Sequence, residues 1–517
     1  MREYNVVMKN RPELLRVALL YPSEYRVALS SLSYQTLYYM VNMDERFAAE
    51  RVVEDWAPLS IESGLHLSRF HYIMVSLHYE LDYAGMVRIL HEARLPLWRQ
   101  SRGEGDPIVI VGGPPATSNP APILDLVDAV VVGEAEPVMP RLLDALASGG
   151  SRKSVLEALA DVPGVYGPAV SEEPATRQYA ANLDEAFHPV AQIQSEEVEP
   201  IWGRSLLVET GRGCTRGCRF CMEGHIMLPR RERSFGVLEK IIREGLSVNR
   251  LGKVAFYDLA FADHKSSREL LELVVEELGA EVSVPSLRAD ALSEEHVYLI
   301  ARGGQRTLTV APETPYHNLC IAINKVVGED VLLSIASTVS RAGFKAIKLY
   351  YIVGLPCEPP EVAEAVAGQV LKVAAAARGL RIRVSANPFM PKPHTPLQWA
   401  PLPSPAEVRA RLRRLSRLLS RAGVEVEYYD PRLAQLQTVL SRGDPELGRV
   451  IVSWALGGGG LGAWRRALMR HGVSVEKYVG GLAVEDELPW EKVVRIGVPR
   501  QALRRGYELY MAAACRA

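Results

Sequence analysis

Short apolar runs alternate with amphipathic stretches over the first 150 residues of the chain. Four of the runs have the length of buried strands: residues 15–21, 72–77, 108–111 and 130–132. Apolar residues with helical spacing lie between them, for example from about Ser31 to Asn42 and up to about Leu95. Strand-length runs separated by helical patterns are typical of a parallel, doubly wound sheet. The pattern therefore predicts a chain of the α/β class that begins with a Rossmann-like domain over residues 1–150.

Small and polar residues follow three of these runs. In a parallel sheet, the carboxyl ends of the strands form the edge at which ligands bind. The residues that we expect at that edge are Ser76, Leu77, Gly112, Gly113, Gly133 and Glu134. This predicts a ligand-binding edge in the first domain.

The remainder of the chain divides into three parts by its pattern. Residues 151–203 are rich in Glu, Pro and Ala and predict a linker. Six strand-like runs with helical stretches between them then predict a partial (β/α)6 barrel over residues 204–402. These runs are residues 205–210, 253–257, 282–286, 307–310, 346–353 and 381–385. Residues 403–517 are mostly helical in pattern, and their basic amphipathic stretch at 406–421 is expected to present a solvated face.

Composition narrows the class of protein. Hydrophobic residues make up 48% of the 517 residues, and the formal net charge is −1. That balance gives no overall indication of nucleic-acid binding. No apolar run is long enough to span a bilayer, and the first residues lack the apolar core of a signal peptide. We therefore expect a cytoplasmic protein without a membrane span.

Half of the six cysteines lie in one glycine-rich stretch. Cys214, Cys218 and Cys221 have the spacing C-x3-C-x2-C, and Gly211, Gly213 and Gly217 surround them. Three thiolates can hold three corners of a four-iron cube and leave the fourth iron open to a ligand. The alternatives are a zinc site, for which His225 could be the fourth ligand, and a pair of redox thiols. The other cysteines, Cys320, Cys357 and Cys515, are scattered, and we expect them to be buried or incidental.

The cysteine stretch, with Phe220 directly before its last cysteine, resembles the cluster-binding loop of the radical SAM superfamily. The resemblance implies that Cys214, Cys218 and Cys221 bind a [4Fe–4S] cluster. The open iron would then bind S-adenosylmethionine (SAM). One-electron reduction would cleave SAM to methionine and a 5′-deoxyadenosyl radical.

The resemblance also assigns SAM contacts to the carboxyl ends of later strands. We expect contacts to the amino group at the second strand, to the carboxylate and ribose at the third, a further polar contact at the fourth, and packing on the adenine at the fifth. The residues at these positions are Tyr257 and Asp258, Arg288 and Asp290, Glu313, and Ile352 and Gly354. Cys357 stands in the turn after the fifth strand, where the family commonly has glycine.

The first domain resembles the cobalamin-binding domain that often precedes a radical SAM core. On this resemblance, Ser76, Leu77, Gly112, Gly113, Gly133 and Glu134 would contact the cobalamin tail. The family's Asp-x-His-x-x-Gly loop is missing after the first strand, so the usual histidine ligand to cobalt is absent. The alternative is a Rossmann-like domain that binds nothing or positions the substrate. His78, a lone histidine after a strand, is expected to be a hydrogen-bonded structural residue.

These features together predict a radical SAM enzyme that acts on an unknown substrate. One outcome is cobalamin-dependent methyl transfer to an unactivated carbon. Sulfur insertion, rearrangement or coupling without cobalamin is a second, and a metal-stabilised, RNA-associated scaffold without enzymatic activity is a third. The radical chemistry requires an electron donor such as ferredoxin or flavodoxin.

Overall fold

The structure is a computed structural model that describes residues 2–285 and 287–515, and these residues form two compact units. The first unit combines the chain up to Arg204 with Val439–Tyr478 and Glu485–Val498. The second combines Ser205–Thr438 and Val479–Val484 with the chain from Pro499 onward. The division at residues 150, 203 and 402 stays a prediction, but the segment 403–517 is shared between the two units.

The first unit is built on a six-stranded sheet in the order β3-β2-β4-β5-β6-β7. Its strands are β2 (Leu15–Tyr21), β3 (Phe47–Val53), β4 (Tyr72–Ser76), β5 (Ile108–Gly112), β6 (Ala129–Val131) and β7 (Val165–Tyr166). All neighbouring pairs are parallel except β6 and β7. The predicted doubly wound domain is confirmed, and its strand order reverses between β2 and β4.

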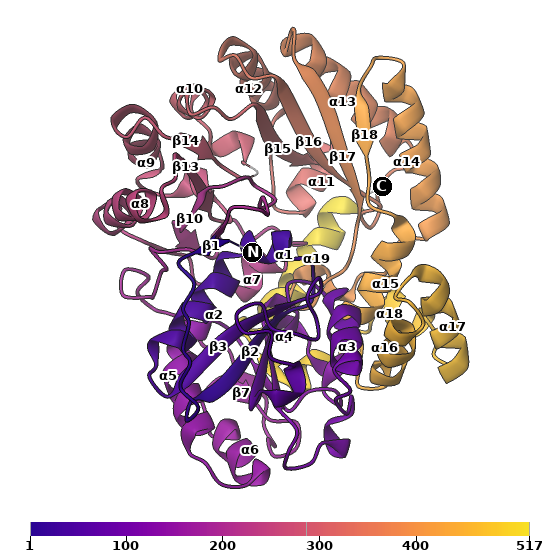
Figure 1. Ribbon diagram of the computed structural model, residues 1–517. Helices are drawn as coiled ribbons and strands as arrows, with labels where there is room; N and C mark the ends of the chain where they lie inside the picture. The colour runs from indigo at the N-terminus through magenta and orange to yellow at the C-terminus, as the bar shows by residue number, and fades with distance from the viewer. Residues whose placement is uncertain (1, 286, 516–517) are drawn as a thin grey trace. The chain divides into compact units, whose positions relative to one another are not determined.

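Helices cover both faces of this sheet (Figure 1). They are α1 (Tyr25–Leu29), α2 (Leu32–Met43), α3 (Asp82–Glu92), α4 (Pro114–Ser118), α5 (Ala135–Ala147) and α6 (Arg152–Ala160). Alternate residues of β2, such as Val17 and Leu19, pack with Tyr38 of α2 and Leu142 of α5 in one apolar core. Short strands β1 (Glu3–Tyr4), β8 (Ala175–Thr176), β9 (Gln194–Ser195) and β19 (Val494–Arg495) form two small pairs beside it.

A late segment of the chain completes the first unit. Helices α16 (Leu447–Leu456) and α17 (Leu461–His471) belong to it, and α16 packs against α3. The buried amide of Asn119 donates hydrogen bonds to the carbonyl oxygens of Ser441 and Gly443, at 3.0 and 2.8 Å. This domain therefore takes essential partners from residues more than 300 positions away.

The second unit is a partial barrel made of two parallel sheets. One has the order β10-β13-β14 and the other β15-β16-β17-β18. The strands are β10 (Leu206–Glu209), β13 (Lys253–Tyr257), β14 (Glu281–Ser283), β15 (Thr307–Glu313), β16 (Ala346–Val353), β17 (Arg381–Pro388) and β18 (Glu425–Glu427). A bridge between Leu287 and Val310 joins the sheets. The predicted partial barrel is confirmed.

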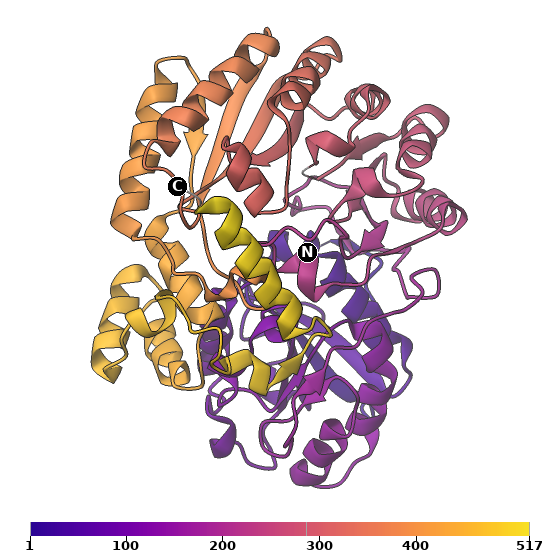
Figure 2. The same cartoon turned by 180° about the vertical axis from the view of Figure 1, so that it is seen from behind.

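Helices follow the strands of the barrel. They are α7 (Glu223–Ile226), α8 (Phe235–Asn249), α9 (Ser267–Glu272), α10 (Glu294–Arg302), α11 (His317–Ala322), α12 (Glu329–Arg341), α13 (Val362–Ala376) and α14 (Pro405–Ser420). Helices α15 (Pro431–Ser441) and α18 (Glu476–Val479) follow later in the chain. The last helix, α19 (Arg500–Ala514), packs beside α11, as Figure 2 shows in yellow.

The observed strands correct two predicted boundaries and add a strand that was not predicted. The third barrel strand was expected over 282–286, but β14 ends at Ser283 and Ser286 lies outside the described residues. The fourth extends to Glu313, three residues beyond the predicted end at Val310. Strand β3 was not predicted, because Glu50 and Arg51 interrupt its apolar run; both side chains are buried in ion pairs.

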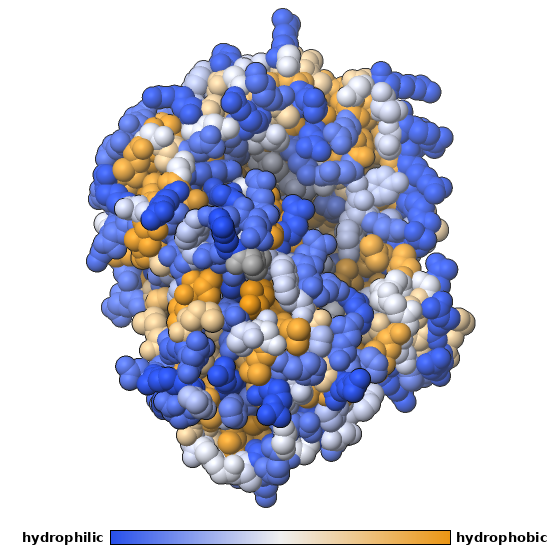
Figure 3. Space-filling view, in the orientation of Figure 1, coloured by the Kyte–Doolittle hydropathy of each residue, from blue (hydrophilic) through white to orange (hydrophobic). Residues whose placement is uncertain are grey.

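The surface gives no sign of a membrane span. The face shown in Figure 3 is largely hydrophilic, with hydrophobic residues in small groups. Across the described part of the chain, every helix is too short or too polar to cross a bilayer.

Candidate functional site

The three clustered cysteines lie in a loop at the carboxyl end of β10, the first strand of the barrel. The loop is closed at its base by the short antiparallel pair β11 (Gly211–Arg212) and β12 (Arg231–Glu232). Gly213 has a φ of +78°, and a Cβ there would lie 2.6 Å from the carbonyl oxygen of Met227. Only glycine fits at this position, because the returning chain passes directly over it.

The thiols of Cys214, Cys218 and Cys221 are free and half-buried. Burial, with smaller contributions from the charges of Cys218 and Cys214, raises the pKa of Cys221 to about 12. Burial also raises the pKa of Cys218, with smaller increases from Glu313 and Cys214. The three sulfur atoms therefore influence one another, and iron binding to this loop must release protons.

Two sulfur atoms accept hydrogen bonds. The N–H of Gly224 donates to Cys221 Sγ at 3.4 Å, and Arg288 Nη1 donates to Cys218 Sγ at 3.6 Å. Such donors are common around the thiolates of iron–sulfur clusters, where they stabilise negative charge on sulfur.

A segment after α11 holds the loop from outside. Asn324 has a φ of +57°, and its Nδ2 donates to the carbonyl oxygens of Arg216 at 2.9 Å and Gly217 at 3.2 Å. The N–H of Arg219 donates to the carbonyl oxygen of Ile323 at 2.9 Å. Asn324 was not among the site residues expected from the sequence. Asparagine is nevertheless one of the residues that adopts the left-handed backbone conformation in strained functional loops.

Tyr257 and Asp258, the expected contacts to the SAM amino group, lie at the end of β13. The Asp258 side chain is fully buried and pairs with Arg230, whose Nη2 lies 3.0 Å from Oδ2. It also accepts from Thr210 Oγ1 at 2.9 Å and from the N–H of Ala260 at 2.7 Å. Asp258 thus secures the segment that returns from the cysteine loop, and its carboxylate is already fully engaged.

Arg288 and Asp290, the expected contacts to the SAM carboxylate and ribose, pair with each other. Arg288 donates from Nε and Nη2 to the two oxygens of Asp290, at 3.0 and 2.9 Å. Arg216 of the cysteine loop lies 3.5 Å from Asp290 and donates to Asp263 at 2.8 Å. Arg216, Asp290 and Arg288 therefore form a series of ion pairs, and Arg288 also contacts Cys218 of the loop.

Glu313 ends β15 with a φ of +66°, which is uncommon for a residue other than glycine. Lys325 Nζ donates to its Oε1 at 2.6 Å, and both side chains are about nine-tenths buried. The positive charge of Lys325 acts on Cys218 by lowering its pKa, against the larger effect of burial. Lys325 was missed by the sequence analysis, because a lone lysine after a helix is ordinarily a surface residue.

Ile352 and Gly354 lie at the end of β16, as expected. Ile352 and Phe220 of the cysteine loop border one apolar cluster, which includes Leu355, Phe389 and Tyr510. The N–H of Gly354 donates to Glu358 Oε2 at 2.7 Å, and Arg411 donates to the same oxygen at 3.0 Å. The turn after the fifth strand is thus fixed by its own carboxylate.

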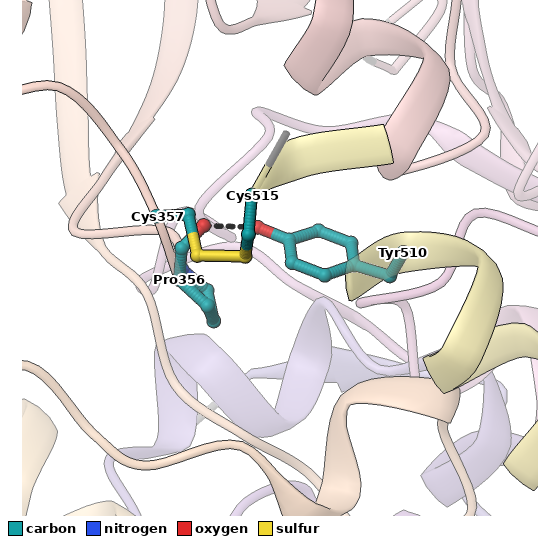
Figure 4. The surroundings of a disulfide bond; sticks show 4 residues. All are labelled: Pro356, Cys357, Tyr510 and Cys515. Atoms are coloured by element: carbon teal, nitrogen blue, oxygen red, sulfur yellow. Dashed lines mark hydrogen bonds between the residues drawn. A yellow bond between two sulfur atoms is a disulfide. The ribbon is translucent and has the colours of Figure 1, made fainter. Parts of the chain in front are cut away.

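Cys357 and Cys515 form a disulfide, which corrects the expectation that both are incidental. The bond joins the turn after β16 to the end of α19, across 158 positions of sequence (Figure 4). Tyr510 supports it by donating a hydrogen bond to the carbonyl oxygen of Pro356 at 2.8 Å. Cys320 is buried, as expected. No sequence pattern indicates a pairing over such a separation.

The first unit contains a second set of expected ligand contacts, at the point where the strand order reverses. Ser76 ends β4, and its Oγ lies 3.3 Å from His78 Nε2. His78 packs against Tyr21 with ring centroids 4.8 Å apart, and burial lowers its pKa to about 4. His78 is therefore neutral and held by its neighbours.

Three of the expected cobalamin contacts lie close to other parts of the first unit. A Cβ on Gly113 would lie 1.9 Å from the carbonyl oxygen of Leu77, and one on Gly133 would lie 2.1 Å from that of Gln178, so both positions require glycine. Glu134 is buried and accepts a hydrogen bond from the N–H of Ala180 at 3.0 Å. Contacts from Ser76, Leu77, Gly112, Gly113, Gly133 and Glu134 to cobalamin stay a prediction.

The cysteine loop offers three thiolates, the ligand type that iron–sulfur clusters take. Within residues 2–285 and 287–515, no group of three or more His, Cys, Asp or Glu side chains is arranged to hold one metal ion. His225, the candidate fourth zinc ligand, instead places Nδ1 2.8 Å from the carbonyl oxygen of Cys221.

Two family models match the chain. Residues 33–168 match the N-terminal region of radical SAM proteins, and residues 208–370 match the radical SAM superfamily. An uncharacterized protein of Methanocaldococcus jannaschii is 28% identical over 435 residues, which are 84% of this chain and 90% of that protein. An uncharacterized methyltransferase of Pyrococcus horikoshii is 27% identical over 266 residues, which are 50% of this chain and 56% of that protein.

Two solved structures share the fold. One is the radical SAM methyltransferase TsrM from Kitasatospora setae with cobalamin and a [4Fe–4S] cluster bound. It has a TM-score of 0.58 at 15% identity and covers 88% of this chain and 100% of its own. The other is the cobalamin-dependent SAM radical enzyme OxsB, with a TM-score of 0.51 at 14% identity, covering 98% of this chain and 80% of its own.

Proposed function

Because this chain belongs to the radical SAM superfamily, we propose that it is an enzyme whose three clustered cysteines hold a [4Fe–4S] cluster. The observation that carries the proposal is the loop itself. Three free thiols lie at the carboxyl end of the first barrel strand, and two of them accept hydrogen bonds. When bound, the cluster and SAM together supply a 5′-deoxyadenosyl radical after one-electron reduction.

The surrounding residues support this chemistry by fixing the loop and shielding it. Asp258 and Asn324 hold the two sides of the loop, so that the sulfur positions are set before a cluster binds. Phe220 and Ile352 extend the apolar cluster toward the loop. An apolar wall protects a radical from water.

The SAM contacts remain proposals, and the geometry changes their expected roles. Glu313 and Lys325 form the best candidate for binding the polar groups of SAM, because both are buried beside Cys218 and Glu313 has a strained backbone. Ile352 and Gly354 keep the role proposed for them at the adenine. Tyr257 and Asp258 are proposed to act by holding the loop.

The finer proposal is methyl transfer to an unactivated carbon, with cobalamin as the methyl carrier. It is supported by the strand order of the first unit, whose switch point lies between β2 and β4, and by the fold shared with TsrM and OxsB. The contacts of Gly113, Gly133 and Glu134 to cobalamin stay part of this proposal, and no catalytic step is assigned to cobalamin. Sulfur insertion, rearrangement or coupling stays the alternative outcome.

The test is anaerobic purification with iron reconstitution, followed by an assay for 5′-deoxyadenosine with SAM and dithionite or a ferredoxin- or flavodoxin-type donor. We expect about four irons per chain and deoxyadenosine formation in the wild type. Cys218→Ala should abolish deoxyadenosine, whereas Cys320→Ala, a buried cysteine outside the loop, should not.

Cobalamin is tested separately, by adding hydroxocobalamin and following its absorption through gel filtration. Retention at about one cobalamin per chain would support the methyl-transfer proposal. Deoxyadenosine without retention would leave the alternative radical outcomes. Zinc in place of iron would favour the scaffold without enzymatic activity and would refute the proposed function.

A further inference from the structure

Arg288 has one arm of its guanidinium directed at a proposed cluster ligand. Its Nε and Nη2 are both used by Asp290, at 3.0 and 2.9 Å, and its Nη1 points to Cys218 Sγ at 3.6 Å. A two-point pair with a carboxylate fixes the plane of a guanidinium. The orientation of Nη1 is therefore set by Asp290 and does not depend on a ligand.

Asp290 is itself held in place. Arg216, midway between Cys214 and Cys218 in the loop, lies 3.5 Å from Asp290 and also pairs with Asp263. Because Arg216 belongs to the loop, the whole arrangement is tied to the chain that carries Cys218. The charges of Arg288 and Lys325 both act on Cys218, and both favour negative charge on its sulfur.

We propose that Arg288 raises the reduction potential of the cluster through its positive charge and its hydrogen bond to Cys218. Asp290 orients the guanidinium of Arg288 for this role. The inference rests on the proposed cluster. It replaces the expected roles of Arg288 and Asp290 at the carboxylate and ribose of SAM.

The physical reason is that reduction adds one negative charge to the cluster. A cation and a donor at a ligand sulfur stabilise the reduced state more than the oxidised state, so they raise the potential. A hydrogen bond from a charged donor is stronger than one from a neutral donor, and part of its strength distinguishes the two oxidation states. Loss of Arg288 should lower the equilibrium constant for one-electron reduction by roughly tenfold, which is about 59 mV.

The experiment is a redox titration of the reconstituted protein without SAM, followed by the electron paramagnetic resonance of the reduced cluster. Wild type is compared with R288Q, R288K and the control R302Q. Arg302 is largely exposed and ends α10, which leads into the amino end of β15, at the opposite edge of the sheet. R302Q loses the same charge from the same barrel and should keep the wild-type potential.

We expect R288Q to shift to a more negative potential by about 59 mV, with a SAM dissociation constant within about twofold of wild type. R288K keeps the charge and should lie between the two. An unchanged potential in R288Q, with SAM binding weakened tenfold or more, would overturn the inference in favour of a SAM contact.

Two further outcomes keep the hypotheses separate. If R288Q retains no iron, the test is made on R288K. A wild-type reduction potential in R288K that carries the cluster, together with weakened SAM binding, would equally refute the inference. If the wild-type protein binds no cluster under reconstitution, the proposed function fails, and the inference fails with it.

Discussion

The disulfide between Cys357 and Cys515 should stabilise the second unit considerably. It closes a segment of 158 residues between the turn after β16 and the end of α19. The chain-entropy relation gives about 5 kcal/mol at 25 °C for a loop of that length, because the bond restricts the unfolded chain.

The perturbation is Cys515→Ser, with Cys320→Ala as a control that removes a buried thiol without a disulfide. Peptide mapping without reductant first measures the fraction of chains that carry the bond. Urea unfolding is then followed by tryptophan fluorescence, because the fully buried Trp399 lies 5.9 Å from the ring of Tyr507 on α19. Wild type is measured with and without dithiothreitol.

We expect C515S to unfold at clearly lower urea than oxidised wild type, and reductant to bring wild type down to the level of C515S. Reductant should leave C515S unchanged. Equal midpoints for oxidised wild type and C515S would refute the reasoning. So would a loss in the control as large as the loss in C515S, because a general effect of cysteine replacement would then explain both.

Two further predictions concern the loop and the first unit. Asn324→Ala removes the two hydrogen bonds to the carbonyl oxygens of Arg216 and Gly217. Iron should then dissociate from the reconstituted protein several-fold faster, as measured by its transfer to a chelator. An unchanged rate would show that the loop keeps its shape without Asn324. Burial raises the pKa of Asp82 to about 7 in the folded state, so the folded protein binds the extra proton and loses stability as the pH rises through 7. The free energy of unfolding should fall by about 1.4 kcal/mol more between pH 6 and 8 in wild type than in Asp82→Asn, and an equal fall in both proteins would contradict the pKa shift.

The architecture could be predicted from the sequence where the pattern was locally complete. The runs that became β4 and β5 are continuous and apolar, and β2 is apolar from Val17 onward, so their burial on both faces can be read from the sequence. Strand β3 could not be recognised, since Arg51 is acceptable inside it only because Glu3 and Glu62 approach from other segments.

The candidate site shows the same division. The cysteine spacing is a local feature and could be recognised directly. The residues that hold the loop are not local: Asn324 and Arg288 lie more than 60 positions from the loop residues that they contact. The glycines are a local feature as well, but the backbone that approaches Gly113 and Gly133 comes from other segments and could not be read from the sequence.

The dependence of the first unit on residues 439–498 has a consequence for its synthesis on the ribosome. The sheet and its helices up to Arg204 emerge first, but the partners of Asn119 and the helix that covers α3 emerge only after the whole barrel has been translated. At typical elongation rates that interval is roughly 10–50 s. During it, the nascent domain exposes an apolar helix face and a buried amide without its acceptors. We therefore expect chaperones to bind the N-terminal half until the late segment arrives.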